Sequence, residues 1–284
     1  MVRRTFDFRL LSAGLLTATA VMLTAAATTQ AASVTKQVYV TFDGSLSGTT
    51  YTLGPGEIDN SFTFGANGSA TISGGVADIP GDVDLTSGFY FSGADLVTEQ
   101  ALGSLKTTNW ITEAIYKPDV PAAGQPSPAG NTNNYGNHIL DLQGDTFYRY
   151  DGFGRTPKVT DFGYWDGGAE DIEPAGEPSV GQFHHIALVW NAGTNSVEAY
   201  LDGVSQGVAT TGSAFDVSSP NIGYGFFSRF LNRAVDGKFD AVAFSTYTGE
   251  FNASSDFQLP TVPEPSAFAL VAIALGGLAW VRKK

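Results

Sequence analysis

Hydrophobic residues between positions 36 and 251 recur in short runs that alternate with polar residues and stop at Gly, Asn, Asp or Pro. A period of two is typical of β-strands, and no window shows the 3.6-residue period of an amphipathic helix. From Trp110 to Tyr116, Trp, Thr, Ala and Tyr alternate with Ile, Glu and Ile, which predicts one aromatic strand face. The expected strands are 38–42, 110–116, 139–142, 147–150, 184–190, 197–201, 221–224 and 238–245.

Many short strands without helices predict an all-β fold, an antiparallel two-sheet sandwich or jelly roll. Residues 191–195 are expected to join two strands as a hairpin loop, and Asp202-Gly203 to close the next turn. No shift in composition divides residues 36–251, so the sequence predicts one domain there and a linker at 252–261.

The first 31 residues have the composition of a secretory signal peptide. Three arginines among the first nine residues precede a mostly apolar run from Leu10 to Ala27, and small residues follow up to Ser33. A basic start, an apolar stretch and a small-residue cleavage site are the three parts of such a signal. We therefore expect residues 1–31 to be removed on export. A retained membrane anchor is the alternative, and Arg3-Arg4 also fits part of a twin-arginine signal.

The last 23 residues contain three elements in order. Val262-Pro263-Glu264-Pro265-Ser266 comes first, an uncharged run from Ala267 to Val281 follows, and Arg282-Lys283-Lys284 ends the sequence. As a helix the uncharged run would span about 22 Å, short of a hydrocarbon core of about 30 Å. The basic residues are expected to stay on the cytoplasmic side, which places everything before the run outside.

Pro263-Glu264-Pro265, the short hydrophobic helix and the basic end resemble the PEP-CTERM sorting signal of Gram-negative bacteria. The resemblance implies that an exosortase, a membrane transpeptidase-like enzyme, recognises the tripeptide and removes the helix. The two prolines hold the segment extended, the form that a protease-like cleft accepts. The protein is then expected to be anchored transiently in the membrane and to end at the cell surface or in the extracellular matrix. An unprocessed tail anchor is the alternative.

Charge and cysteine content exclude several classes of function. Residues 32–262 carry nine basic and 26 acidic residues, a formal charge of −17. Such a domain repels phosphate backbones, so nucleic acid is not an expected partner. The sequence has no cysteine, which excludes disulfides, thiolate metal sites and cysteine nucleophiles.

The stretches from Phe183 to Asn191 and from Val197 to Val204 resemble laminin-G-like domains of the concanavalin A-like jelly-roll group. Their shared pattern is an aromatic residue, His184-His185, an apolar strand, a hairpin and then Tyr-x-Asp-Gly. The blocks Phe42-Asp43-Gly44, Trp110 to Pro118 and Asp236 to Val242 occur in the order expected for such a domain. The resemblance implies a concanavalin A-like jelly roll.

Two long loops are expected to carry ligand contacts, because segments of this length without regular structure are usually functional or mobile. Residues 118–137 hold four prolines, and residues 164–181 hold five acidic residues and no basic one. Tyr135, Tyr164 and Trp165 lie in these loops, and aromatic rings stack on sugar faces. We take them as the candidate ligand contacts; packing within the loops is the alternative.

No cofactor is predicted with certainty, but Ca²⁺ is a candidate. Some laminin-G-like domains bind Ca²⁺ in their rim loops, and Asp82, Asp84 and the acidic loop offer the oxygen ligands that Ca²⁺ prefers. None of these residues has the spacing of a known calcium motif. A solvated, mobile acidic surface is the alternative for the loop.

No catalytic set is recognisable, so we expect no enzyme activity. His184 and His185 are neighbours on a strand and point to opposite faces, and His138 stands at a strand entrance without a recognisable partner. Residues 203–207 match G-x-S-x-G by letter, but they lead from a turn into a strand, whereas a nucleophile elbow leads into a helix. The Glu-x-Asp-x-x-Glu pattern of laminarinase-type glycoside hydrolases is absent.

The sequence thus predicts an exported surface or matrix protein whose laminin-G-like module binds glycans or is associated with biofilm exopolysaccharide. Its expected partners are the exosortase, the membrane before processing, and an extracellular polysaccharide. A structural surface protein without a ligand is the first alternative. A polysaccharide hydrolase or lyase with an unfamiliar active site is the second.

Overall fold

A computed structural model describes residues 31–59, 63–80, 88–92, 108–121, 137–142, 146–150, 157–160, 171–172, 177–210, 221–225 and 234–260. These residues form strands, turns and bends, and no helix among them is long and apolar enough to cross a membrane. The predicted signal peptide, the sorting motif and the hydrophobic C-terminal run lie outside the described residues.

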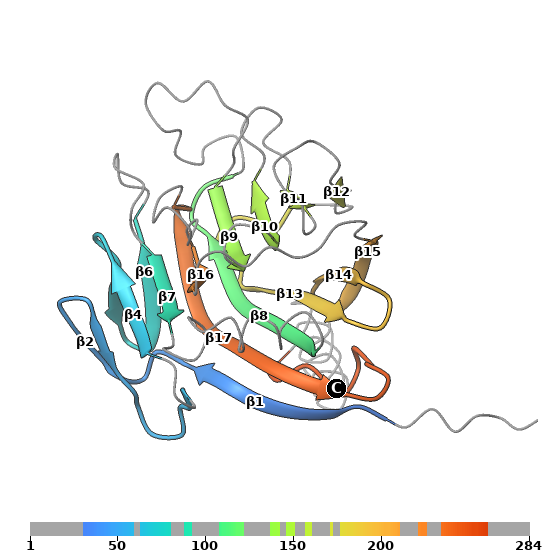
Figure 1. The fold of residues 1–284 in the computed structure, drawn as a ribbon. Coiled ribbons are helices and arrows are strands. Elements are labelled where there is room, and N and C mark those ends of the chain that lie inside the picture. The colour runs from blue at the N-terminus through green and yellow to red at the C-terminus, as the bar shows by residue number, and fades with distance from the viewer. Residues whose placement is uncertain are drawn as a thin grey trace, which may run out of the picture.

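Two antiparallel sheets make up the fold and confirm the predicted all-β sandwich (Figure 1). The eight-stranded sheet has the order β15 (Val204–Thr210), β14 (Ser196–Leu201), β13 (His184–Asn191), β8 (Asn109–Pro118), β17 (Gly237–Thr248), β6 (Val76–Ile79) and β5 (Thr71–Ser73), with β1 (Ser33–Val40) also on β17. The nine-stranded sheet has the order β12 (Asp171–Ile172), β11 (Pro157–Thr160), β10 (Thr146–Tyr150), β9 (Asn137–Leu142), β16 (Asn221–Tyr224), β7 (Gly88–Ser92), β4 (Thr63–Asn67), β3 (Thr50–Thr52) and β2 (Ser45–Ser47).

Each of the eight predicted strands overlaps a strand of the structure. The prediction for 221–224 coincides with β16, whereas β17 continues past the predicted end at Ser245 to Thr248. The sequence analysis omitted β2, β3, β5 and β12, which are two or three residues long and too short to show a period, and also β4, β6, β7 and β11, which are four or five residues long. It also named no strand after the Asp202-Gly203 turn, where β15 begins at Val204.

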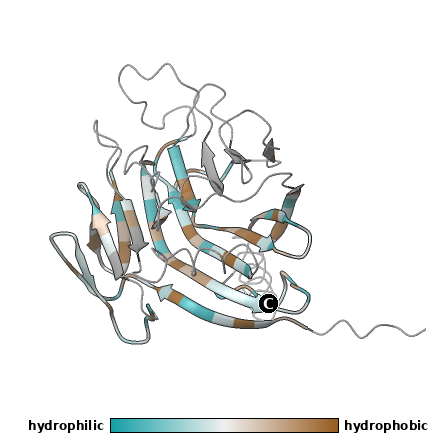
Figure 2. Ribbon diagram, viewed as in Figure 1, coloured by the Kyte–Doolittle hydropathy of each residue, from teal (hydrophilic) through white to brown (hydrophobic). Residues whose placement is uncertain are grey.

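The main core lies between the sheets, and β8 contributes its predicted aromatic face to it. Trp110, Ala114 and Tyr116 are buried together with Ile222 and Tyr224 of the nine-stranded sheet. Trp110 stacks on Trp190 of β13, with 6.3 Å between ring centroids. Figure 2 shows hydrophobic residues recurring along the central strands of the eight-stranded sheet. Because the alternate residues of these strands point away from the core, the sheet has a second, outer face.

A segment after β17, residues 251–260, covers much of this outer face; we call it the strap. Phe251, Ala253 and Phe257 pack against a buried outer cluster, and Leu259 packs against a second one. The outer clusters contain Ile111, Ile115, Ala187, Val189, Tyr200, Ala241, Ala243 and Tyr247. The strap coincides with the part of the predicted linker 252–261 that the structure describes, and its residues are packed on the sandwich.

β1 closes the edge of the eight-stranded sheet. It pairs antiparallel with the second half of β17, from Ser33 opposite Thr248 to Val40 opposite Val242. β6 pairs with the first half of the same strand, at Gly237 to Phe239. Figure 1 shows β1 in blue running beside β17 in orange. The two ends of the sandwich sequence are therefore neighbours in space.

Candidate functional site

The three candidate ligand contacts, Tyr135, Tyr164 and Trp165, lie outside the described residues. The structure does describe the strands that their loops join. The first loop ends at Asn137, which lies opposite Tyr150 of β10, and the second leaves Thr160, which lies opposite Phe147 of the same strand. The two loops therefore attach to β9 and β11, which lie on either side of β10, and they do so at opposite ends of these strands.

His184 lies in a chain of hydrogen bonds that begins at Ser179. The Ser179 backbone N–H donates to His184 Nε2 at 2.9 Å, and Ser179 Oγ is also 2.9 Å from Nε2. Because a backbone N–H can only donate, Nε2 is an acceptor and Nδ1 carries the ring proton. His184 Nδ1 then donates to Asp202 Oδ2 at 2.8 Å, and the second oxygen, Oδ1, accepts the His185 N–H at 2.9 Å.

This serine–histidine–aspartate order matches a nucleophile–base–acid relay in its connectivity. The surroundings of these residues favour a structural role. His184 Nε2 is shared between the hydroxyl and a backbone N–H, so the serine does not have the base to itself. The neighbouring N–H groups of Gly181 and Gln182 donate to Pro118 O and Ser179 O, which removes them as oxyanion donors. The contacts fasten the 202–203 turn and the 179–182 turn to β13.

The motif at residues 203–207 enters β15, as the sequence analysis expected. Ser205 Oγ donates to Glu198 Oε1 on β14 at 2.5 Å, and both residues are near the surface. Gly207 has φ +139°, and a Cβ there would lie 3.1 Å from Ile172. The glycine of this motif thus allows close packing with β12 and has no part in a nucleophile elbow.

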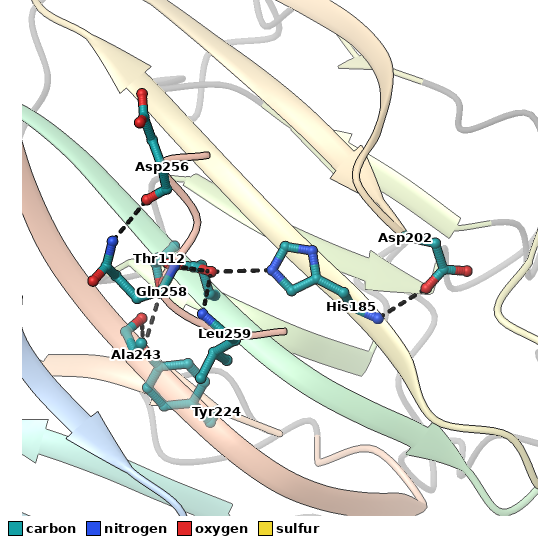
Figure 3. A network of polar contacts seen from close by, with 9 residues as sticks. Thr112, His185, Asp202, Tyr224, Ala243, Asp256, Gln258 and Leu259 are labelled. Carbon is teal, nitrogen blue, oxygen red and sulfur yellow. Dashed lines mark hydrogen bonds and ion pairs between the residues drawn. The ribbon is translucent and has the colours of Figure 1, made fainter. Parts of the chain in front are cut away.

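His185 points to the outer face and meets a buried carboxylate. Its Nε2 lies 3.1 Å from Glu113 Oε2, and both side chains are fully buried. Glu113 also accepts backbone N–H groups of the strap, from Gln258 at 3.0 Å and from Leu259 at 3.1 Å. Figure 3 shows the His185 ring pointing toward the segment that carries Gln258 and Leu259, with Asp202 on its backbone side. Two backbone N–H groups and a histidine nitrogen thus surround one buried carboxyl group.

Aromatic rings seal this contact from solvent. The Phe257 ring lies 4.6 Å from the His185 ring and 5.2 Å from Tyr200, and Phe251 lies 5.6 Å from Tyr247. Burial raises the pKa of Tyr247 to about 12, and burial also raises the pKa of Tyr200, with a further contribution from Glu198. Both phenols therefore stay neutral at physiological pH, and the cluster is apolar.

The third histidine has a partner, contrary to the sequence analysis. His138 Nδ1 lies 3.1 Å from Asp141 Oδ1, and both side chains are fully buried on β9. The two residues are separated by three positions, which an extended strand would place on opposite faces. The register shift between β9 and β10, next to His138, explains how they meet.

A half-buried carboxylate, Glu57, organises the loop at Phe42-Asp43-Gly44. Glu57 accepts the Thr41 N–H at 2.8 Å and the Tyr51 hydroxyl at 2.9 Å, and it also accepts the Gly54 N–H. Burial raises the pKa of Tyr51, so its hydroxyl remains a donor. This part of the laminin-G-like pattern holds its own loop together.

Among the described residues no group of three or more His, Asp or Glu side chains is placed to hold a metal ion. Asp82 and Asp84 lie outside the described residues, as does most of the acidic loop. Of its acidic residues, Asp171 lies in the short strand β12 opposite Thr160, where a loop was predicted, and Glu177 is exposed. Calcium thus stays a prediction that rests on residues outside the described ranges.

Sequence reasoning missed Glu113 and the strap as one unit. Glu113 was assigned to the non-aromatic face of its strand, which is correct, but that face was not expected to be covered. Its partners Gln258 and Leu259 are more than 140 positions away in the sequence. An acidic residue inside an otherwise apolar strand was the available signal, because such a residue is rarely buried without donors.

Two family models match the sequence. One, described as the concanavalin A-like lectin/glucanases superfamily, matches residues 104–250. The other, described as the PEP-CTERM protein-sorting motif, matches residues 261–283, which include Val262 to Ser266 and, of the basic end, Arg282 and Lys283. Among curated proteins, none matches the sequence.

Two solved structures illustrate the likeness in fold. Domain 4 of AbnA, a GH43 extracellular arabinanase from Geobacillus stearothermophilus, in complex with arabinotriose, has a TM-score of 0.50 and 14% identity, covering 78% of this chain and 96% of that chain. Trypanosoma rangeli sialidase in complex with 2,3-difluorosialic acid has a TM-score of 0.50 and 13% identity, covering 76% of this chain and 31% of that chain. At these identities the likeness concerns the sandwich fold alone.

Proposed function

The chain belongs to the concanavalin A-like lectin/glucanase superfamily, and from that premise we propose that its sandwich binds an extracellular polysaccharide outside a Gram-negative cell. The PEP-CTERM motif indicates an exported, transiently membrane-anchored protein that an exosortase processes. The observation that carries the proposal is the combination of a lectin/glucanase-type sandwich with a sorting signal for export in one chain. A signal peptide at residues 1–31 completes the route, and a place in a biofilm matrix follows from it.

The candidate binding surface is formed by the loops of the nine-stranded sheet. The strap occupies much of the outer face of the other sheet, which leaves the loops for recognition. The first loop meets the sheet at Asn137 of β9, and the second at Thr160 of β11. These residues are two strand spacings apart across the sheet and three residues apart along the strands, so about 14 Å separates them. Tyr135, Tyr164 and Trp165 are the side chains that we expect to stack on sugar rings.

Charge restricts the kind of polysaccharide. With a formal charge of −17 between residues 32 and 262, the domain repels anionic chains. We therefore expect it to bind a neutral polysaccharide directly, and an anionic one only with a bridging cation such as Ca²⁺. The arabinotriose in the AbnA domain 4 structure supports the proposal to the extent that a related sandwich is seen with an oligosaccharide.

The test is binding of purified residues 32–260 to glycan arrays and to matrix from the producing organism. We expect retention on at least one neutral glycan, and loss of most of that binding in Trp165→Ala and in Tyr164→Ala. Val208→Ala is the matched control, because Val208 is 56% exposed on the edge of the other sheet. Absence of binding to every glycan and to the matrix would refute the proposal and favour a structural surface protein without a ligand.

We also propose that the domain has no hydrolase or lyase activity. The engagement of Ser179, His184 and Asp202 in fastening two turns supports this. Release of reducing ends or unsaturated products from matrix glycans, abolished by Ser179→Ala, would contradict it. Mass spectrometry of the mature protein tests export and processing separately. We expect it to show loss of residues 1–31 and of the C-terminal apolar run.

A further inference from the structure

The strap ends immediately before the sorting motif. Leu259 is 3% exposed and is packed among Ile115, Ala241 and Ala243, whereas Pro260 is exposed. The family match to the motif begins at residue 261. The last fixed point of the sandwich is thus two residues from the start of the signal that is processed in the membrane.

The strap is held by specific contacts along its length. Asp256 accepts the Asn252 N–H at 2.7 Å and closes a turn, and the Gln258 side chain donates to Asp256 O at 2.8 Å. Glu113 accepts two backbone N–H groups of the strap, as described above. Undocking would break these hydrogen bonds and expose the apolar side chains of the two outer clusters to water, so the strap is expected to stay docked while the sandwich is folded.

A docked strap leaves a short tether. From Leu259 to Pro263 the chain spans at most about 14 Å, and from Leu259 to Ala267, where the apolar run begins, at most about 28 Å. While the apolar run is in the membrane, the sandwich must therefore stay close to the headgroups. The part of its surface around Leu259 is the part that the tether holds nearest.

That part of the surface combines aromatic and basic side chains. Tyr39 and Phe183 pack beside Leu259, Lys36 Nζ lies 4.1 Å from the Tyr39 ring centroid, and Lys117 Nζ lies 5.0 Å from the Phe183 ring centroid. We call these four residues and Leu259 the tail-exit surface. Lys238, across from Lys117, is held between Asp78 and Asp119, so its charge is balanced within the protein.

Two of the nine basic residues of an acidic domain thus flank the point where the tail leaves. Aromatic rings and lysines are the side chains that suit the boundary between lipid and water. An acidic domain is repelled by an anionic bilayer unless the surface that faces the bilayer carries basic side chains. Each lysine near such a bilayer increases the binding constant for the membrane surface about fivefold.

We propose that the tail-exit surface lies against the anionic headgroups of the membrane while the protein is anchored, and that the strap fixes this orientation. The proposal rests on the sorting motif and is independent of polysaccharide binding. Processing would cut the tether and release the surface from the membrane.

The absence of cysteine in the sequence allows a clean test by single-cysteine labelling. The chain without its signal peptide is reconstituted in vesicles of anionic or of zwitterionic lipid, with no glycan and no enzyme present. Gln182→Cys reports on the tail-exit surface, since Gln182 is exposed beside Phe183. Thr194→Cys is the control, because Thr194 is exposed in the hairpin at the other end of β13, about 26 Å away along the strand.

In anionic vesicles we expect a membrane-impermeant maleimide to label Gln182→Cys at least about fivefold more slowly than Thr194→Cys. Lys36→Glu with Lys117→Glu should remove most of this protection. Ten Gly and Ser residues inserted between Pro260 and Thr261 should also remove it without touching the sandwich, whereas Glu113→Gln should loosen the strap itself. Circular dichroism would establish that each variant is folded.

Equal labelling at both positions in anionic vesicles would overturn the proposal. Protection that is unchanged in zwitterionic vesicles, or in the variant with two glutamates, would also overturn it. Protection that arises only when the processing enzyme is added would identify that enzyme as the partner of this surface and rule out the membrane.

Discussion

Each of the three histidines of the sequence is hydrogen-bonded to a carboxylate. His138 meets Asp141, His184 meets Asp202, and His185 meets Glu113. Asp202 also accepts the backbone N–H of His185 on the same strand as His184, and Glu113 also accepts backbone N–H groups of the strap. These hydrogen bonds stabilise the packing of turns and of the strap on the strands.

Asp240 is a carboxylate in a less favourable setting. Partial burial raises its pKa above the ordinary value, and the negative charge of Asp43 raises it further. It lies at the bulge of β17 between Phe239 and Ala241. A carboxyl whose pKa is raised by folding binds its proton more tightly in the folded state, so ionising it costs stability.

We therefore predict that Asp240→Asn stabilises the protein above the titration of this group and has no effect below it. The gain in Tm should be near zero at about pH 3, increase as the pH passes the ordinary aspartate value of about 3.9, and level off above the raised pKa. Screening by solvent limits it to about 2 °C. Thermal unfolding between pH 3 and pH 8 measures it; an equal shift at every pH would show that ionisation is not the cause.

At the scale of elements, glycine controls how the strands of the two sheets approach each other. Gly225 follows β16 with φ +84°, and a Cβ there would lie 1.9 Å from Ile79 Cδ1 and 3.1 Å from Phe239 Cε2. Ile79 and Phe239 are fully buried, so neither side chain can move into solvent. The turn after β16 can therefore pack on β6 and β17 only because it has no side chain.

Gly225→Ala is predicted to lower the free energy of unfolding by about 3 kcal/mol, from backbone strain and overpacking together. Gly48→Ala is the matched control: its φ is +61° but nothing lies within 4 Å of the added Cβ, so only the strain of about 1 kcal/mol is expected. Urea denaturation of both variants gives the difference. Equal losses would show that Ile79 and Phe239 adapt without cost.

Eight of the 17 described strands could be predicted from the sequence, among them the long central strands, where alternation marks both a strand and its buried face. Trp110 to Tyr116 showed its aromatic side in this way. The strap could not be predicted, because its stretch from Asn252 to Asp256 is small and polar, as in a linker, and its docking depends on Glu113 far away in the sequence. His138 was misjudged for a similar reason, since a bulge decides which residues meet. The candidate contacts Tyr135, Tyr164 and Trp165 remain predictions.

At the scale of the molecule, the excess of acidic residues opposes folding. Nine basic residues face 26 acidic ones between positions 32 and 262, and one of the basic residues, Lys238, is held between Asp78 and Asp119. Like charges within one compact body repel each other, and salt screens that repulsion.

We predict that raising NaCl from about 20 mM to about 200 mM increases the Tm of residues 32–260 at pH 7 by about 3 °C, or roughly 1 kcal/mol. At pH 4, where many carboxylates are neutralised, the increase should be much smaller. A lower Tm at high salt would mean that attractive pairs dominate. A further increase with CaCl₂ at equal ionic strength would reveal the cation site for which Asp82 and Asp84 are candidates.

The pairing of β1 with β17 determines when the domain can finish folding. Ser33 and Thr248 are partners across more than 200 residues, and β17 also joins β8 to β6 at the centre of its sheet. Contacts of such long sequence separation form slowly, because the intervening chain must be closed into a loop first. Because a chain is synthesised from its N-terminus, β1 cannot pair with β17 until residues up to Thr248 have been made. The eight-stranded sheet thus cannot be completed before the chain has been synthesised as far as Thr248.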